Sequence, residues 1–417
     1  MKNSYKGIDI HKKILKPRWY LMLVEWAATL YFSIINRVKY KKTNFKSFKE
    51  PSLILATHAS MQDFASMVGL MFPYRTCWVI SIEEFNGREW LFRHIGGIPK
   101  RKFTSDIILI KHIAEMIRKK HMSVVIYPET RFSLAGVNEQ LSPALGKLAK
   151  LCKSRVIVVK QNGNFIVSPQ WAKHPYRDNH VEAFATQLFS KEEVEKLDAN
   201  IIQERIEQEF VYDDYKWQND NRIRTKCNKR AENIHKILYK CPVCGKEGMT
   251  NSKGIHIWCE NCNSKWEMDE YAELHCLTGE NHFKLPSDWY RWEKDECYKE
   301  VNNRTYHFED DIRIENLIDT HKKFVEIGTI HMSHDMNGFV LKGKLYDGND
   351  FELIKPPLSM RSCHIEYDYK GRGDALDMAT IDDTWWVYPV HPCCLTKFNF
   401  ATEAIYAKAA RENENNK

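Results

Sequence analysis

The sequence predicts an α/β domain, then a small cysteine-rich ribbon, then a mainly antiparallel β domain closed by a helix. Three observations indicate this order. Apolar runs alternate with helix-like stretches in residues 52–160, paired cysteines begin at Cys241, and strand-like runs separated by glycine turns fill residues 289–389. The chain has 417 residues, 43% of them hydrophobic, which is enough for two or three domains. This composition excludes a disordered protein.

Residues 1–50 are predicted to contact a membrane. They hold twelve lysines and arginines against three acidic residues, whereas the whole chain has a formal charge of +7. These cations flank Trp19–Ile35, an apolar stretch in which Glu25 is the only charge. As a helix it is about 25 Å long, shorter than a bilayer core of about 30 Å. We therefore expect a monotopic helix in an anionic membrane surface, with a buried core helix as the alternative.

The α/β domain is expected over residues 51–235. Its strands are predicted at the apolar runs SLILA, CWVISI, SVVIY and RVIVVK, which begin at residues 52, 77, 123 and 155. Between them, Asp106–Lys120 places Ile107, Ile110, Ala114 and Ile117 at helical spacing. The charged and periodic residues 191–238 predict helices that end the domain.

Four thiols predict a metal site in residues 236–280. Cys241 and Cys244 form one C-x-x-C pair, and Cys259 and Cys262 form a second. Two such pairs reach one tetrahedral Zn²⁺ from two tight turns, and a site closed by four sulfurs is structural rather than catalytic. A redox pair is the alternative, although one C-x-x-C would suffice for it. The other eight cysteines show no framework spacing and, together with a thiolate–metal site, indicate a reducing compartment.

The last predicted domain covers residues 285–411. Its apolar runs are short and alternating, and Asn337-Gly338 and Asp347-Gly348 mark turns between them. Leu395–Arg411 reads as a closing helix. Several strands followed by one helix predict a small antiparallel barrel or sandwich of the pleckstrin-homology type.

A histidine and an aspartate follow the first predicted strand. Leu53–Ala56 is apolar, His58 comes just after it, and Asp63 lies in what reads as the first turn of a helix. If His58 lies in the turn before that helix, Asp63 can accept a proton from one ring nitrogen and leave the other nitrogen as a general base. The alternative is an ordinary helix start with an unrelated histidine.

Two further loops carry charge at predicted strand ends. Gly96 and Gly97 precede the cations Lys100, Arg101 and Lys102. The strand Val124–Tyr127 is followed by Pro128, Glu129, Thr130 and Arg131. Basic groups on such loops are suited to binding phosphate.

Taken in order, these motifs resemble the glycerolipid acyltransferase family typified by 1-acylglycerol-3-phosphate acyltransferases. The resemblance covers residues 17–210. Thr57 stands where the family usually has asparagine, and Glu129-Thr130-Arg131 is one residue shorter than the family's Glu-Gly-Thr-Arg block.

The resemblance implies transfer of a fatty acyl group from acyl-CoA or acyl-carrier protein to a hydroxyl of a lysophospholipid or glycerol phosphate. His58 and Asp63 would be catalytic. Lys100, Arg101, Lys102, Glu129, Thr130 and Arg131 would bind the substrate. We expect an enzyme of phospholipid synthesis at the cytoplasmic face of a membrane, monotopic or peripheral, with anionic lipids as partners.

Two other functions remain as alternatives: a catalytically degenerate lipid-binding scaffold and a zinc-ribbon nucleic-acid-binding protein. The second is disfavoured because the basic charge surrounds an apolar helix rather than the ribbon, and no nucleic-acid partner is expected.

Overall fold

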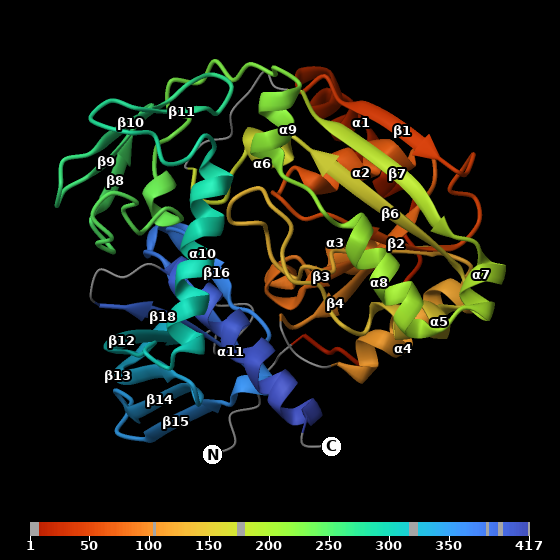
Figure 1. Ribbon diagram of the computed structural model, residues 1–417. Helices are drawn as coiled ribbons and strands as arrows, with labels where there is room; N and C mark the ends of the chain where they lie inside the picture. Colours follow the sequence, from red (N-terminus) through yellow and green to blue (C-terminus); the bar gives the residue numbers. More distant parts are fainter. Residues whose placement is uncertain are drawn as a thin grey trace. The chain divides into compact units, whose positions relative to one another are not determined.

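The computed structural model describes residues 8–102, 106–172, 180–316, 324–380, 383–390 and 395–415. It divides into two compact units (Figure 1). Of the described residues, 8–101, 106–169 and 180–225 make the first unit. Residues 102, 170–172 and those from 226 onward make the second.

The first unit contains a seven-stranded mixed sheet in the order β1-β7-β6-β2-β5-β3-β4. Its strands are β1 (Lys39–Thr43), β2 (Ser52–Ala56), β3 (Thr76–Ser81), β4 (Gly97–Lys100), β5 (Ser123–Ile126), β6 (Arg155–Asn162) and β7 (Glu182–Phe189). All neighbouring pairs are parallel except β6 and β7. The predicted α/β fold is therefore confirmed, and β2, which precedes His58, lies in the centre of the sheet.

Helices cover both faces of this sheet (Figure 1). They are α1 (Trp19–Ile35), α2 (Asp63–Met71), α3 (Glu89–His94), α4 (Ile107–Arg118), α5 (Leu145–Cys152), α6 (Asn164–Val167), α7 (Lys191–Lys196), α8 (Ala199–Glu209) and α9 (Asp214–Asp220), with a 3-10 turn at Ile82–Phe85. Along β2, Leu53 and Leu55 pack with α4, α5 and α8, whereas Ile54 and Ala56 pack with α2. This alternation follows from the pleat of a strand buried on both faces.

Helix α1 coincides with the predicted Trp19–Ile35 and leaves one face uncovered. Met22 and Thr29 are buried, and α1 packs on α2, where the rings of Trp26 and Phe72 lie 5.0 Å apart. On the other face Leu23, Tyr31 and Ile34 are 53%, 67% and 68% exposed. Among the described residues, no helix has the length and apolar character that crossing a membrane requires. The alternative of a fully buried core helix does not fit these exposures.

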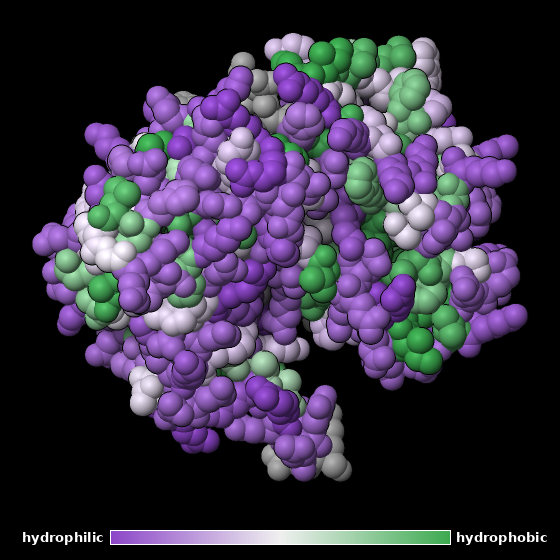
Figure 2. Space-filling model, turned by 45° about the horizontal axis from the view of Figure 1, so that its top comes forward, coloured by the Kyte–Doolittle hydropathy of each residue, from purple (hydrophilic) through white to green (hydrophobic). Residues whose placement is uncertain are grey.

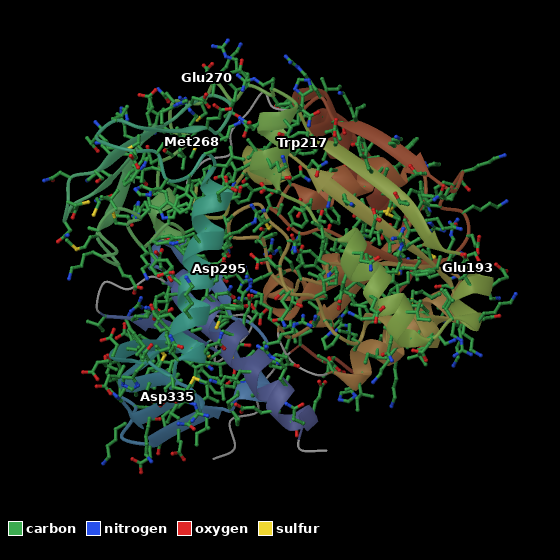
Figure 3. The ribbon with its side chains drawn as sticks, in the orientation of Figure 1. Glu193, Trp217, Met268, Glu270, Asp295 and Asp335 are labelled. Atoms are coloured by element: carbon green, nitrogen blue, oxygen red, sulfur yellow. The ribbon has the colours of Figure 1, made fainter. Side chains whose placement is uncertain are left out.

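The second unit begins with a four-stranded antiparallel sheet in the order β11-β10-β9-β8. Its strands are β8 (Thr250–Lys253), β9 (His256–Cys259), β10 (Lys265–Met268) and β11 (Leu274–Cys276), and α10 (Pro286–Asn302) follows. A 3-10 turn, Ile234–Lys236, precedes the sheet. Arg230 holds the end of β10 by donating to the carbonyl oxygen of Met268 at 2.7 Å, and Met268 is labelled in Figure 3.

The rest of the second unit is an antiparallel sheet of seven strands in the order β15-β14-β13-β12-β18-β17-β16. The strands are β12 (Phe308–Asn316), β13 (Val325–Asp335), β14 (Gly338–Lys344), β15 (Asp350–Lys355), β16 (His364–Glu366), β17 (Ala375–Ala379) and β18 (Thr384–Pro389), with 3-10 turns at Pro357–Ser359 and Tyr369–Gly371. Strand β12, the first of the seven along the chain, pairs with both β13, the second, and β18, the last. The closing helix is confirmed as α11 (Leu395–Asn415), which packs on α10.

Candidate active site

His58 lies in the turn between β2 and α2, as a contact with Asp63 requires. Its ring nitrogen Nδ1 is 3.0 Å from Asp63 Oδ2. The same oxygen accepts the backbone N–H groups of Ala59 at 2.6 Å and Ser60 at 3.0 Å. Because Asp63 is the first residue of α2, its carboxylate also lies at the positive end of a helix. These donors fix the position of Oδ2, which can accept a hydrogen bond from Nδ1 of the His58 ring.

The imidazole of His58 is fixed by aromatic rings. It stacks on Tyr127 with centroids 4.0 Å apart and planes inclined by 19°, and Phe132 packs against it at 4.3 Å. The His58 side chain remains 20% exposed, whereas that of Asp63 is 1% exposed. A neutral His58 that donates from Nδ1 has its lone pair on Nε2, so the exposed ring can take a proton from a bound hydroxyl.

Glu129 supports the main chain of His58 from inside the domain. Its Oε2 accepts the backbone N–H of His58 at 2.9 Å. Its Oε1 accepts the backbone N–H of Glu139 at 2.9 Å and the hydroxyl of Tyr212 at 3.0 Å. Glu129 is 1% exposed, and burial raises its pKa to about 8, although the hydrogen bonds from His58, Glu139 and Tyr212 act in the opposite direction. This carboxyl group therefore acts on the site through the backbone.

The other predicted substrate-binding residues have different surroundings. Arg131 pairs with Glu139 at 2.7 Å, and both side chains are 2% exposed. Thr130 has a φ of +69°, and its hydroxyl accepts from Lys100 Nζ at 3.4 Å. Arg101 is half-buried directly after β4. The structure thus brings Lys100 and the Glu129–Arg131 segment together.

Lys102 belongs to the second unit by its contacts. Its ammonium group lies 3.0 Å from Asp377 Oδ2 and 3.3 Å from Glu366 Oε1. The role of Lys102 in substrate binding stays a prediction.

Sequence reasoning missed three buried polar residues of this site. Asn164 Nδ2 donates to Asp63 Oδ1 at 2.9 Å, Gln161 lies beside Asn164, and Tyr212 donates to Glu129. A signal for the first two was available. Gln161 and Asn164 follow the apolar run of β6 as His58 follows that of β2, and the two strands are parallel neighbours. Nothing in the sequence distinguishes Tyr212 from other tyrosines.

The four predicted thiols gather at one point of the second unit. The Sγ atoms of Cys241 and Cys262 are 3.6 Å apart, and those of Cys244 and Cys259 are 3.7 Å apart. All four lie within 4.8 Å of one another. Four sulfurs at about 2.3 Å from a tetrahedral Zn²⁺ are about 3.8 Å apart, so the cluster has the size and the ligand type of a zinc site.

The family model described as Acyltransferase matches residues 37–161, which include β2, the His58 turn and the Glu129–Arg131 segment. The chain carries an acyltransferase-family domain. The family predicted from the sequence is confirmed over these residues.

No curated protein matches the chain. Among solved structures, the chain is similar to the 1-acyl-sn-glycerophosphate (LPA) acyltransferase PlsC from Thermotoga maritima. The two share 14% sequence identity with a TM-score of 0.37, over 46% of this chain and 77% of that chain.

Proposed function

We propose that this protein transfers a fatty acyl group from a thioester, acyl-CoA or acyl-carrier protein, to a hydroxyl of a lysophospholipid or glycerol phosphate acceptor. The observation that carries the proposal is the His58–Asp63 contact of 3.0 Å within an acyltransferase-family domain. An exposed imidazole held in one tautomer by a buried carboxylate is a general base. The same contact argues against a degenerate lipid-binding scaffold, which has no need of it.

In the proposed reaction a proton passes from the acceptor hydroxyl to His58 and then from His58 to the leaving thiolate. His58 Nε2 takes the proton of the acceptor hydroxyl while that oxygen attacks the thioester carbonyl. Asp63 stabilises the imidazolium that forms. When the carbon–sulfur bond of the tetrahedral intermediate breaks, the thiolate leaves and receives the proton from His58. The acceptor oxygen keeps the acyl group, so no covalent acyl-enzyme is required.

The acceptor phosphate is proposed to bind at Lys100, Arg101 and Thr130. Lys100 lies at the end of β4 in contact with Thr130. Cations at strand ends beside a general base hold an anionic acceptor in the geometry of attack. Glu129 and Arg131 are proposed to support this site from inside the domain, because their side-chain polar groups are buried in contacts with His58 and Glu139.

The first unit is proposed to sit on an anionic membrane surface through α1. Figure 2 turns the view of Figure 1 so that its top comes forward, which places α1 along the top edge. Hydrophobic residues, drawn in green, gather along this edge. The edge strand β1 follows α1 and carries Lys39, Lys41 and Lys42. An apolar helix face with cations beside it binds anionic lipid by insertion and by charge. This is the surface where a lysolipid acceptor and its product reside.

Zinc is proposed as a structural ion held by Cys241, Cys244, Cys259 and Cys262. It would join the turn before β8 to the turn between β9 and β10. The seven-stranded sheet with α11 is proposed to be a pleckstrin-homology-like module, supported by the pairing of its first strand with both the second and the last.

The test of the proposed reaction is mass spectrometry of lipids after incubation with palmitoyl-CoA and a panel of lysophospholipids. His58→Ala should lower the transfer rate by about 10²- to 10⁴-fold, because a general base is lost. Asp63→Asn should be comparably impaired, since an amide cannot accept from Nδ1 and from the backbone as the carboxylate does. His11→Ala, at an exposed histidine of the same unit, is the control. Full turnover in His58→Ala would exclude this mechanism.

A further inference from the structure

Asp63 is held on its second oxygen by a polar side chain that comes from a distant part of the chain. Asn164 Nδ2 lies 2.9 Å from Asp63 Oδ1, 2.9 Å from Ser66 Oγ and 3.2 Å from Gln161 Oε1. Asp63, Ser66 and Asn164 are fully buried. The oxygen Oδ2 faces His58, so the two oxygens of this carboxylate have separate partners: the imidazole side and the Asn164 side.

The backbone around Asn164 is built to hold this amide in place. Gly163 has a φ of +88°, and a Cβ there would lie 2.3 Å from the carbonyl oxygen of His180, so only glycine fits. The backbone N–H groups of Gly163 and Phe165, on either side of Asn164, both donate to Asp214 Oδ2, at 3.2 and 3.3 Å. Asp214 is itself fully buried at the start of α9. Trp217, on α9 in Figure 3, donates to Glu182 of β7 and so ties the helix to the sheet.

The network also fixes which way the amide of Asn164 points. Its Nδ2 faces three oxygen atoms, whereas its Oδ1 is buried with no hydrogen-bond partner in the described part of the chain. Turning the amide over would bring Oδ1 against the carboxylate of Asp63. Asn164 can therefore only donate to Asp63. A buried acceptor without a hydrogen-bond partner is rare in folded proteins. Its presence at Oδ1 indicates that this position is occupied by asparagine for the hydrogen bonds that Nδ2 donates.

Gln161 connects this amide to the strand end that carries His58. Its backbone N–H donates to Thr57 Oγ1 at 2.9 Å, and its side-chain amide donates to the carbonyl oxygen of Thr57 at 3.1 Å. Its Oε1 then accepts from Asn164 and from Ser66. The residue just before His58 and the carboxylate beside His58 are thus held by one buried network.

We propose that Asn164 is a positioning residue for the proposed acyl transfer: by donating to Oδ1 it holds the Asp63 carboxylate in the rotation in which Oδ2 meets Nδ1 of His58. The proposal rests on the proposed function and names a residue that acts through Asp63 without touching substrate. Donation to Oδ1 stabilises the carboxylate and sets its rotation, and Asp63 then keeps the proton of His58 on Nδ1. The exposed Nε2 stays ready to accept the proton of the attacking hydroxyl.

Two substitutions at Asn164 separate this role from a merely structural one. Asn164→Leu keeps the branched shape of the side chain and removes the donor. Asn164→Asp introduces a carboxyl group next to Asp63, and two carboxyl groups at this distance share a proton, so one pKa is strongly raised. Below that pKa the shared proton replaces the amide hydrogen, and above it the two carboxylates repel. Asn200→Asp, on the exposed side of α8, adds the same charge in the same unit and serves as the control.

Activity is measured with palmitoyl-CoA and the lysophospholipid that gives the highest wild-type rate, from pH 5.5 to 9, with folding followed by circular dichroism. Asn164→Leu should lower kcat by about 10- to 100-fold, the usual effect of losing a group that orients a functional residue, with KM little changed. The rate of Asn164→Asp divided by that of the wild type should fall as the pH rises. Asn200→Asp should match the wild type at every pH.

The tautomer of His58 gives a readout that needs no substrate. In protein labelled with ¹⁵N-histidine, and with His58 assigned by its loss in His58→Ala, the neutral ring should carry its proton on Nδ1. Asn164→Leu should show a mixture of the two tautomers. Wild-type kcat together with a pure Nδ1–H ring in folded Asn164→Leu would overturn the proposal. If the wild-type protein acylates no acceptor of the panel, the proposed function fails, and the tautomer of Asn164→Leu still decides the role of Asn164.

Discussion

Two carboxyl groups of the first unit are buried for different reasons. Glu129 accepts hydrogen bonds from His58, Glu139 and Tyr212, which offset part of the cost of its burial. Glu25 lies in α1 among apolar neighbours, and its Oε1 is buried without a hydrogen-bond partner in the described residues. Burial alone raises the pKa of Glu25 to about 7. A charge that has no compensating donor weakens the fold whenever it is ionised.

Glu25→Gln should therefore stabilise the protein at alkaline pH. The folded pKa of Glu25 lies above its unfolded value, so the folded state binds more protons between about pH 4.5 and 7, and stability falls as the pH rises through this range. The variant should exceed the wild type by roughly 1 to 3 kcal/mol at pH 8 and match it at pH 4.5. Thermal unfolding at both pH values measures this. An equal difference at both would mean that Glu25 does not titrate in this way.

At the site, the sequence was sufficient for His58 and Asp63 and insufficient for their supports. The pair is five residues apart, and only one local arrangement, a turn before a helix, lets the side chains meet, so the contact followed from the chain itself. Asn164 is 101 residues from Asp63 and Tyr212 is 83 residues from Glu129. Buried polar partners at such separations leave no periodic pattern. Arg131 had the residue type of a phosphate ligand, and its pairing with Glu139 depends on packing that composition does not reveal.

Among the secondary-structure elements, α1 differs from the others in how much of its apolar surface is exposed. Trp19, Leu23 and Tyr31 are 66%, 53% and 67% exposed. Soluble proteins rarely expose a contiguous apolar face, and such faces mark sites of contact with other molecules. The lysines of β1, the strand that follows α1 in the chain, support the proposal that this face contacts an anionic membrane.

Replacing Trp19, Leu23 and Tyr31 together by glutamate should release the protein from vesicles of phosphatidylcholine and phosphatidylglycerol. Insertion of the apolar face is lost, and three acids oppose the attraction of the neighbouring lysines. Sedimentation with the vesicles measures the bound fraction. The control replaces Leu151, Ile201 and Val211, which are also exposed apolar residues of this unit, by glutamate. A wild-type protein that stays in the supernatant would contradict the membrane assignment.

Elements with a strong pattern were predicted well, and edge elements were not. The run Trp19–Ile35 and the four apolar runs matched α1, β2, β3, β5 and β6, because continuous burial demands continuous apolar sequence. Strand β1, with the sequence KYKKT at the sheet edge, was missed because its side chains are mostly exposed and therefore polar. Strand β7 was missed as well, since its mixed pattern reflects its place next to that edge.

At the scale of the whole molecule, the two units have separate means of stabilisation. The first has apolar clusters on both faces of its sheet. The second begins with four short strands of three or four residues around the cysteine cluster. Strands this short bury little apolar area, so the proposed zinc would supply folding free energy for this region.

Cys259→Ser should lower the zinc content from one ion per chain to nearly none. Because ribbon folding depends on the ion, limited proteolysis should then cut the second unit first and leave a resistant fragment of the first unit. Metal is measured by mass spectrometry of the purified protein. Cys276→Ser, at a half-buried cysteine of β11 outside the cluster, should keep both the zinc and the resistance. Iron in place of zinc, or no metal in the wild type, would contradict the assignment.

The long separation between the partners of the His58 turn has a consequence for biosynthesis. His58 receives support from Glu129, which in turn is held by Tyr212. At about 5 to 20 residues per second, a ribosome needs about 8 to 30 s to advance from His58 to Tyr212. During that interval the nascent chain already contains α1 but lacks Tyr212, the residue that holds Glu129 beneath the His58 turn. Under the proposed function, a growing chain could contact a lipid surface through α1 before its His58 turn is complete, and a chain released before Tyr212 would be inactive.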